Sequence, residues 1–126
     1  MEKKAVQTGA APEAIGPYSQ AIVSNGYVFC SGQVPLDPST GELIKGSIAD
    51  QTRRCMASLE SVLSAAGSDI GKIVKTTIYL MDMDDFVEVN EAYGEFFSNE
   101  PPARATVQVA GLPKGARVEI ECVARV

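Results

Sequence analysis

Residues 101–126 decide the fold prediction, and they read Pro-Pro-Ala-Arg-Ala-Thr-Val-Gln-Val-Ala-Gly-Leu-Pro-Lys-Gly-Ala-Arg-Val-Glu-Ile-Glu-Cys-Val-Ala-Arg-Val. Two runs typical of β-strands, 103–109 and 117–126, flank the turn-forming segment Gly-Leu-Pro-Lys-Gly. A strand, a turn and a second strand in this order predict a hairpin that closes the chain.

Polar and apolar residues alternate along both of these predicted strands. Because successive side chains of a strand point to opposite faces, one face of the hairpin would carry Arg104, Glu119 and Glu121. The spacing alone leaves two interpretations open: a surface ion pair worth about 0.2–1 kcal/mol, or an arginine that grips a small carboxylate beside a proton-handling glutamate. The opposite face is predicted to be core: Ala103, Ala105, Val107, Val109, Val118, Ile120, Cys122 and Ala124.

Two helices are predicted upstream of this hairpin. Ser47 matches the N-cap of a capping box, apolar residues then recur every three or four positions, and Gly67 ends the pattern, which gives about five helical turns. A second helix is predicted over residues 84–97, with Asp82 or Asp84 as its cap.

Four further strands are predicted, over residues 5–6, 21–24, 27–31 and 73–81. Asn25-Gly26 between the second and third is a strong hairpin signal. The element order β-β-β-α-β-α-β-β predicts an α+β fold in a single domain spanning 1–126, with one mainly antiparallel sheet and both helices packed on one face. The uncovered face would meet solvent or other subunits, and an apolar content of 45% favours subunits.

The composition excludes several classes of function. A net charge of −5 and a pI near 4.7 argue against a nucleic-acid or anionic-membrane binder, and no apolar run is long enough to span a membrane. Three cysteines without a signal peptide favour the reducing cytoplasm, with the cysteines as small buried residues. The absence of histidine removes the usual general base, and no metal site is expected.

Several candidate site residues are ambiguous when each is taken alone. Tyr18 could be a loop aromatic on the core or part of a pocket, and Ser31 could end a strand with a backbone hydrogen bond. Gly32 beside that hydroxyl would let a ligand approach the backbone closely. Asn90, next to an apolar helix position, could lie on the surface or be buried and hydrogen-bonded.

Taken together, these segments resemble the RidA (YjgF) family, close to its 2-iminobutanoate/2-iminopropanoate deaminase type. The resemblance runs from near residue 11 to the C-terminus, and its C-terminal motif is specific. The matching segments are 15–20 (Ile-Gly-Pro-Tyr-Ser-Gln), 31–35 (Ser-Gly-Gln-Val-Pro), 37–42 (Asp-Pro-Ser-Thr-Gly-Glu), 74–77 (Val-Lys-Thr-Thr), 89–90 (Val-Asn), 102–104 (Pro-Ala-Arg), 112–114 (Leu-Pro-Lys) and 118–121 (Val-Glu-Ile-Glu).

The resemblance implies a chorismate-mutase-like fold and a homotrimer with three clefts between subunits. It implies an enzyme that hydrolyses C=N bonds, converting reactive 2-imino or enamine acids to 2-keto acids and ammonia, with no cofactor of its own. Its role would be to remove reactive intermediates released by other enzymes. Two alternatives remain: a regulatory module that senses small carboxylates in the same clefts, and RNA cleavage or translation inhibition, which the acidic charge and missing histidines disfavour.

The resemblance also assigns roles to individual residues. Arg104 matches the arginine that grips the substrate carboxylate, and Glu119 matches the glutamate that holds and activates water. The substrate-binding residues expected at the site are Tyr18, Ser31, Gly32, Asn90, Arg104 and Thr106.

Position 106 departs from some relatives, which carry a cysteine two residues after the arginine. This chain has Thr106 there, so thiol chemistry at the site is not expected, whereas the hydrolysis is unaffected. Glu121 receives no role from the resemblance and is expected to be structural.

Overall fold

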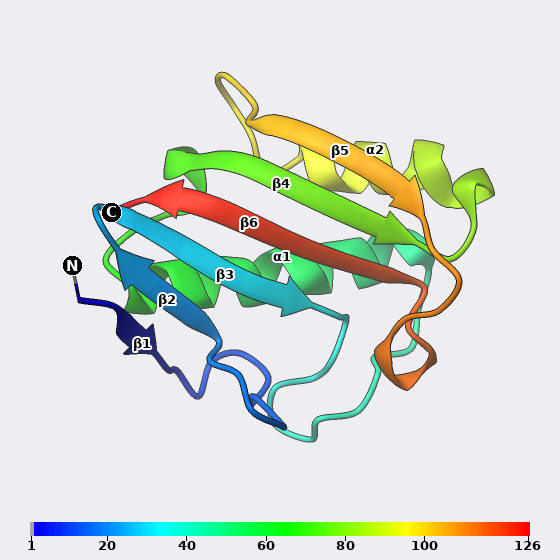
Figure 1. The fold of residues 1–126 in the computed structure, drawn as a ribbon. Helices are drawn as coiled ribbons and strands as arrows, with labels where there is room; N and C mark the ends of the chain where they lie inside the picture. The colour runs from blue at the N-terminus through cyan, green and yellow to red at the C-terminus, as the bar shows by residue number, and fades with distance from the viewer. Residues whose placement is uncertain (1) are drawn as a thin grey trace.

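Six strands form one sheet in the computed structural model, which describes residues 2–126 (Figure 1). Their order in the sheet is β1-β2-β3-β6-β4-β5, and every neighbouring pair is antiparallel except β4 with β5. The expected mainly antiparallel sheet is therefore confirmed. The bounds are β1 Lys4–Val6, β2 Ala21–Ser24, β3 Tyr27–Gln33, β4 Ile73–Leu80, β5 Ala103–Gln108 and β6 Val118–Arg125.

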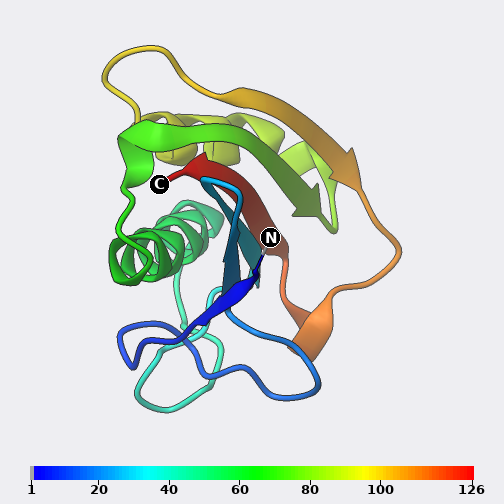
Figure 2. The same ribbon diagram turned by 60° about the vertical axis from the view of Figure 1, so that its left-hand side comes forward.

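Both helices cover one face of the sheet, as expected for this α+β arrangement. They are α1, Ile48–Ala65, and α2, Phe86–Gly94. In Figure 1 both lie behind the sheet, and Figure 2 shows the sheet curving around them. The other face of the sheet, called the open face below, is covered by no helix of residues 2–126.

The helix boundaries follow from their caps. Ser47 accepts a hydrogen bond from the Asp50 amide and Asp50 returns one, so the predicted capping box is confirmed. The second helix begins later and ends earlier than predicted, since Asp82 caps the short 3₁₀ turn η2, Met83–Asp85, before α2 starts. At its end, Phe97 bonds back to Gly94, three residues earlier, so the last turn has tightened out of α geometry.

The predicted hairpin around Asn25-Gly26 is confirmed. Asn25 and Gly26 both have positive φ, 54° and 80°, as the tight turn that matches strand twist requires. The resulting pair, β2 with β3, supports the short β1 along its outer edge.

The predicted C-terminal hairpin is wrong, because β4 lies between β5 and β6. In Figure 1 the connection after β5 runs past the end of β4 before β6 enters the sheet. This connection contains the short turn η3, Pro113–Gly115, and is too long for a tight hairpin loop. Its ends bond to β4 rather than to each other, through Val109 N to Leu80 O at 2.9 Å and Met81 N to Arg117 O at 3.1 Å.

The inserted strand also reverses the predicted faces of β5. Residues that pair across a sheet share a face, and Thr76 of β4 pairs with both Arg104 and the buried Cys122. Arg104 therefore lies on the helix side, whereas Glu119 and Glu121 lie on the open face. The residues predicted as core on β5 correspondingly lie on the open face, Ala103, Ala105 and Val107, and the core residues predicted on β6 are confirmed as buried: Val118, Ile120, Cys122 and Ala124.

The hydrophobic core lies between the sheet and the two helices, and it contains all three cysteines as free thiols. Burial raises the pKa of the Cys55 thiol, so this residue stays an uncharged apolar group at neutral pH. No helix in residues 2–126 combines the length and apolar composition needed to cross a membrane. The same residues include no cluster of three or more side chains that could ligate a metal ion.

Candidate functional site

Residues of the proposed site gather around two separate hollows. The first, the Glu119 hollow, has a volume of about 460 Å³. It lies where the loop before β2, the end of β3, η3 and the start of β6 meet. Its lining residues are Glu13, Ile15, Tyr18, Ser31, Gly32, Val34, Leu36, Pro113, Lys114 and Glu119.

A β-bulge positions Ser31 and Gly32 at this hollow. The pairing of β3 with β6 shifts register between Cys30 and Gln33. The Ser31 hydroxyl donates to the backbone oxygen of Ser19 at 2.6 Å, and the Ser31 amide donates to Gln20 O at 3.0 Å. Ser31 thus ties the loop carrying Tyr18 to the sheet.

Glu119 fills the space that a side chain at position 32 would need. A Cβ built on Gly32 would lie 2.0 Å from Glu119 Oε2, so the glycine is required for room rather than for backbone freedom. Among residues 2–126 no group donates a hydrogen bond to the Glu119 carboxylate. Burial raises the pKa of Glu119, and the negative charge of Glu121 raises it further. A half-buried carboxylate with free lone pairs suits a proton acceptor for water.

The second hollow, the Arg104 hollow, lies on the helix side of the sheet and has a volume of about 340 Å³. The guanidinium of Arg104 donates to Asn90 Oδ1 at 2.7 Å. Its Cζ atom lies 5.3 Å from the ring centroid of Tyr93 and 5.7 Å from that of Phe86. The lining residues are Asn90, Tyr93, Gly94, Phe97, Pro101 and Arg104.

These contacts orient Arg104 without neutralising it. No Asp or Glu among residues 2–126 forms an ion pair with Arg104, although three such pairs involve Arg53 and Arg117. The ring of Tyr93 is itself fixed, because its hydroxyl lies 2.7 Å from the buried Thr76 Oγ1. An exposed, oriented guanidinium with free N–H groups is suited to binding a carboxylate through two parallel hydrogen bonds.

Thr106 lies on the same side of β5 as Arg104, two residues further along. Its Oγ1 atom is buried and has no hydrogen-bond partner within residues 2–126. A buried hydroxyl without a partner costs free energy, so it is either a local defect or a group available to a ligand or a second chain.

The sheet separates the predicted site residues into two groups. Tyr18, Ser31, Gly32 and Glu119 meet at the first hollow. Asn90 and Arg104 meet at the second, and Thr106 shares their side of the sheet. The prediction that one face of a single chain unites Arg104 with Glu119 is wrong, because β4 places them on opposite faces.

Three residues in or beside these hollows were not predicted as site residues. Tyr93 and Phe86 are predicted as part of the core stripe of α2, yet both rings lie near Arg104, and Tyr93 follows Asn90 by three positions and so shares its side of the helix. Lys114 has a left-handed backbone, with φ of 57°, and its Nζ donates to Gly41 O at 2.8 Å. No sequence signal announces this last contact, because it joins two loops far apart in the chain.

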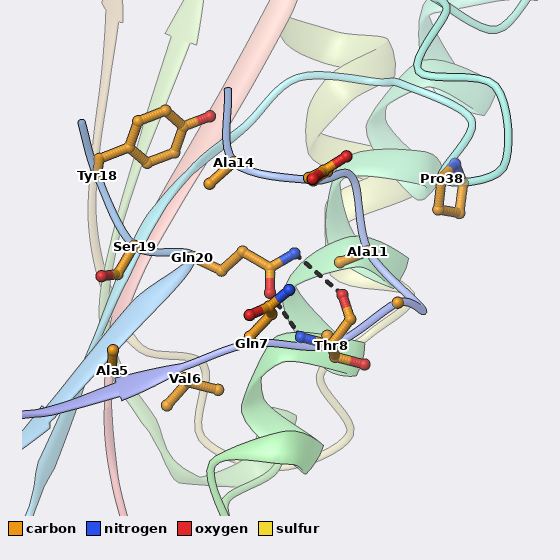
Figure 3. A pocket seen from close by; sticks show the side chains of 12 residues that line it. Ala5, Val6, Gln7, Thr8, Ala11, Ala14, Tyr18, Ser19, Gln20 and Pro38 are labelled. Atoms are coloured by element: carbon orange, nitrogen blue, oxygen red, sulfur yellow. Dashed lines mark hydrogen bonds between the residues drawn. The ribbon is translucent and has the colours of Figure 1, made fainter. Parts of the chain in front are cut away.

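A third hollow, of about 430 Å³, lies behind the N-terminal segment (Figure 3). Tyr18 and Gln20 both line this hollow. The Gln20 side chain is already fully hydrogen-bonded: its Oε1 accepts from Thr8 N, and its Nε2 donates to the carbonyls of Thr8 and Pro12. These bonds fasten the N-terminal segment to β2, so we assign this hollow a supporting role.

Comparison with protein families places the chain. The family model described as Endoribonuclease L-PSP, which corresponds to the RidA (YjgF) family, matches residues 8–126. The chain belongs to this family.

Its relatives carry several names. The protein DfrA of Myxococcus xanthus is 51% identical over 126 residues, covering 98% of this chain and 96% of DfrA. The 2-iminobutanoate/2-iminopropanoate deaminase of Mus musculus is 48% identical over 122 residues, covering 97% of this chain and 90% of the mouse protein. Among solved structures, E. coli TdcF with bound serine matches with a TM-score of 0.93 and 40% identity, covering 98% of both chains. The α+β fold of this family is thus the fold of the chain.

Proposed function

We propose that this protein hydrolyses small 2-imino acids, such as 2-iminobutanoate and 2-iminopropanoate, to 2-keto acids and ammonia. The observation that carries the proposal is the half-buried Glu119 carboxylate, which lies against Gly32 and accepts no hydrogen bond from residues 2–126. A substrate water can use those free lone pairs. The deaminase named among the relatives supports the same reaction, and the serine bound to TdcF supports a site for a small carboxylate.

The proposed site needs a second copy of the chain. Arg104 and Glu119 lie on opposite faces of one sheet, so an Arg104 hollow can meet only the Glu119 hollow of another molecule. Such a head-to-tail contact forms a closed ring when the rotation between successive copies is a whole fraction of a full turn, which is one third of a turn for three copies. We assign a homotrimer with three clefts between its subunits. The open face carries exposed apolar side chains, which would be buried in the contacts between subunits: Tyr27, Phe29 and Val107.

The reaction uses the two hollows in different ways. Arg104 holds the substrate carboxylate through two hydrogen bonds, which orients the C=N carbon toward the water at Glu119. The water oxygen attacks this carbon while Glu119 takes a proton from the water and the imine nitrogen gains a proton.

The resulting carbinolamine then collapses. The amino nitrogen takes the proton that Glu119 holds, the hydroxyl proton leaves, the C=O bond forms and the C–N bond breaks, which releases ammonia and the 2-keto acid. Tyr18 and Ser31 supply hydroxyl groups at this hollow. An imine beside a carboxylic acid is already electrophilic, so a covalent nucleophile is not required.

Binding without turnover is a second candidate, because the printed ligand of TdcF is the amino acid serine. A regulatory module that senses small carboxylates would use the same two hollows. It would bind a 2-keto acid tightly but release no ammonia from an imine.

A coupled assay tests the proposed hydrolysis. An amino-acid oxidase or a threonine dehydratase generates the imine, and the appearance of the 2-keto acid is followed with and without the purified protein. We expect faster release with the protein and a loss of about 10²–10³-fold in kcat/KM for Arg104→Ala, since a bidentate charged contact is removed.

The matched control is Arg53→Ala, which removes an exposed arginine outside both hollows and should leave the activity unchanged. No acceleration by the unmodified protein, or full activity of Arg104→Ala, contradicts the proposal. Sedimentation should give three times the chain mass of 13.3 kDa.

A further inference from the structure

The open face of β6 carries two carboxylates with different surroundings. Glu119 and Glu121 are two positions apart, so their side chains lie on the same side of the strand. The Tyr79 hydroxyl donates a hydrogen bond to Glu121 Oε1, whereas no group in residues 2–126 donates one to Glu119. Both side chains end in a carboxylate, but only the Glu119 carboxylate accepts no hydrogen bond from residues 2–126 and is therefore free to bind water.

The strand register explains how Tyr79 reaches Glu121. Tyr79 of β4 pairs directly with Glu119, and Thr77 pairs with Glu121. The Tyr79 side chain therefore reaches diagonally across the strand pair, from its position opposite Glu119 to Glu121. Because β4 and β6 are both interior strands, this contact depends on the sheet rather than on a loop.

The charges around Glu119 support a division of roles. The hydrogen bond to Glu121 is the main cause that raises the pKa of Tyr79, so the hydroxyl keeps its proton and remains a donor. On α1, Cys55 lies beneath β6 on the helix side, and its thiol stays protonated. The remaining titratable groups that face the Glu119 hollow are Glu13, Tyr18 and Lys114.

After burial, among the titratable groups around Glu119, Glu121 is the one whose charge raises the pKa of Glu119. The Lys114 ammonium is directed to Gly41 O, 2.8 Å away. The negative charge of Glu121 follows burial as the cause that raises the pKa of Glu119.

We propose that Tyr79 and Glu121 are positioning residues for Glu119: their hydrogen bond fixes the Glu121 carboxylate beside Glu119 and makes Glu119 the carboxylate that takes the proton from water. This inference rests on the proposed hydrolysis. It assigns Glu121 a function in place of the purely structural one expected from the sequence, and it adds Tyr79, which no sequence motif marks.

The pH dependence of the reaction tests the pair. In Glu121→Gln the acidic limb of kcat/KM should move to lower pH by about 0.5–1 unit, because a negative charge near Glu119 is removed. At neutral pH kcat should fall about two- to fivefold, since Glu119 becomes a weaker base, and KM should not change. Tyr79→Phe keeps the negative charge of Glu121 but removes the hydrogen bond that holds it in place. The acidic limb should therefore shift in the same direction by a smaller amount.

The matched control is Glu60→Gln, which removes one exposed carboxylate from α1. It should leave both the limb and kcat unchanged. An acidic limb that stays in place in Glu121→Gln, or that moves equally in Glu60→Gln, overturns the inference.

A second readout does not require turnover. Carboxyl carbon NMR of the labelled, substrate-free protein follows the titration of Glu119, whose signal is assigned by its loss in Glu119→Gln. We expect its midpoint to fall in Glu121→Gln and, by less, in Tyr79→Phe. Unchanged midpoints in both variants overturn the positioning pair even if the protein is an active deaminase.

The conservative Tyr79→Phe change keeps this test decisive if Glu121→Gln does not fold. Shifted midpoints in a protein without deaminase activity support the electrostatic pair and contradict the proposed hydrolysis alone. The two failures are therefore distinguishable.

Discussion

Arg104 on β5 and Glu119 on β6 are placed by different kinds of structure. β5 is an edge strand, and Arg104 is exposed, held by an amide and two aromatic rings of α2. β6 is an interior strand, and Glu119 is half-buried against the backbone of Gly32. The proposed carboxylate-binding group, Arg104, thus lies where another molecule can reach it, whereas the proposed proton acceptor, Glu119, lies where desolvation raises its pKa.

Mixing two inactive variants gives the largest expected effect on this comparison. Arg104→Ala and Glu119→Gln are co-expressed with different tags, and mixed oligomers are purified through both tags. If each site takes Arg104 from one chain and Glu119 from the next, every mixed trimer contains one intact site among its three, so the purified oligomers should show about a third of the original activity. A site contained within one chain would stay inactive.

The control for this mixing experiment pairs Arg104→Ala with the double variant Arg104→Ala/Glu119→Gln. No oligomer of that mixture contains an intact arginine, so it should stay inactive. Equal recovery in both mixtures would contradict the two-chain site.

Gly32→Ala should disturb the Glu119 hollow and leave the Arg104 hollow unchanged. The new methyl group would lie 2.0 Å from Glu119 Oε2, so the carboxylate must move, and we expect kcat to fall about 10–100-fold. KM should change much less, because Arg104 is untouched. Gly111→Ala is the control, since its Cβ would meet nothing within 4 Å. An unchanged kcat for Gly32→Ala would mean that the position of Glu119 does not matter.

Thr106→Val tests the side of the sheet on which Arg104 lies. The Thr106 hydroxyl is buried without a partner in residues 2–126, so removing it should raise the free energy of unfolding by about 0.5–1 kcal/mol. If the hydroxyl binds substrate, KM should rise two- to fivefold, measured in the same coupled assay. Thr76→Val is the matched control, because its hydroxyl is bonded to Tyr93 and its loss should lower stability by about 1 kcal/mol. Destabilisation by Thr106→Val would reveal a partner for its hydroxyl.

Glu119→Gln should have a small effect on stability whose size depends on pH. The folded state raises the pKa of Glu119 above its ordinary value of 4.5, so the ionised form is disfavoured on folding. Around neutral pH the variant should therefore melt about 1–2 °C higher than the original protein. The difference should vanish below pH 4.5, where the carboxyl group is protonated in both states. Glu60→Gln should show no such pH dependence, and a Glu119→Gln difference that is constant with pH would contradict the raised pKa.

Local signals were sufficient for most secondary structure. The capping box at Ser47 and the Asn25-Gly26 turn act through contacts within a few residues, so both could be predicted and both are confirmed. The layer arrangement also followed, because two amphipathic helices and an alternating sheet bury one face each. The C-terminal pairing could not be predicted, because β4 and β6 are neighbours in the sheet although α2 and β5 separate them in the sequence.

The sequence by itself determined the residue types, the helices and strands that carry them, and the family resemblance that named Arg104 and Glu119. Only the tertiary structure decided which face each residue occupies. The side-chain period of two fixes faces within a strand, but relative faces of two strands depend on which strand lies between them and in what register. The insertion of β4 therefore separated a pair of residues that the sequence pattern had joined, and it brought Tyr79 to Glu121.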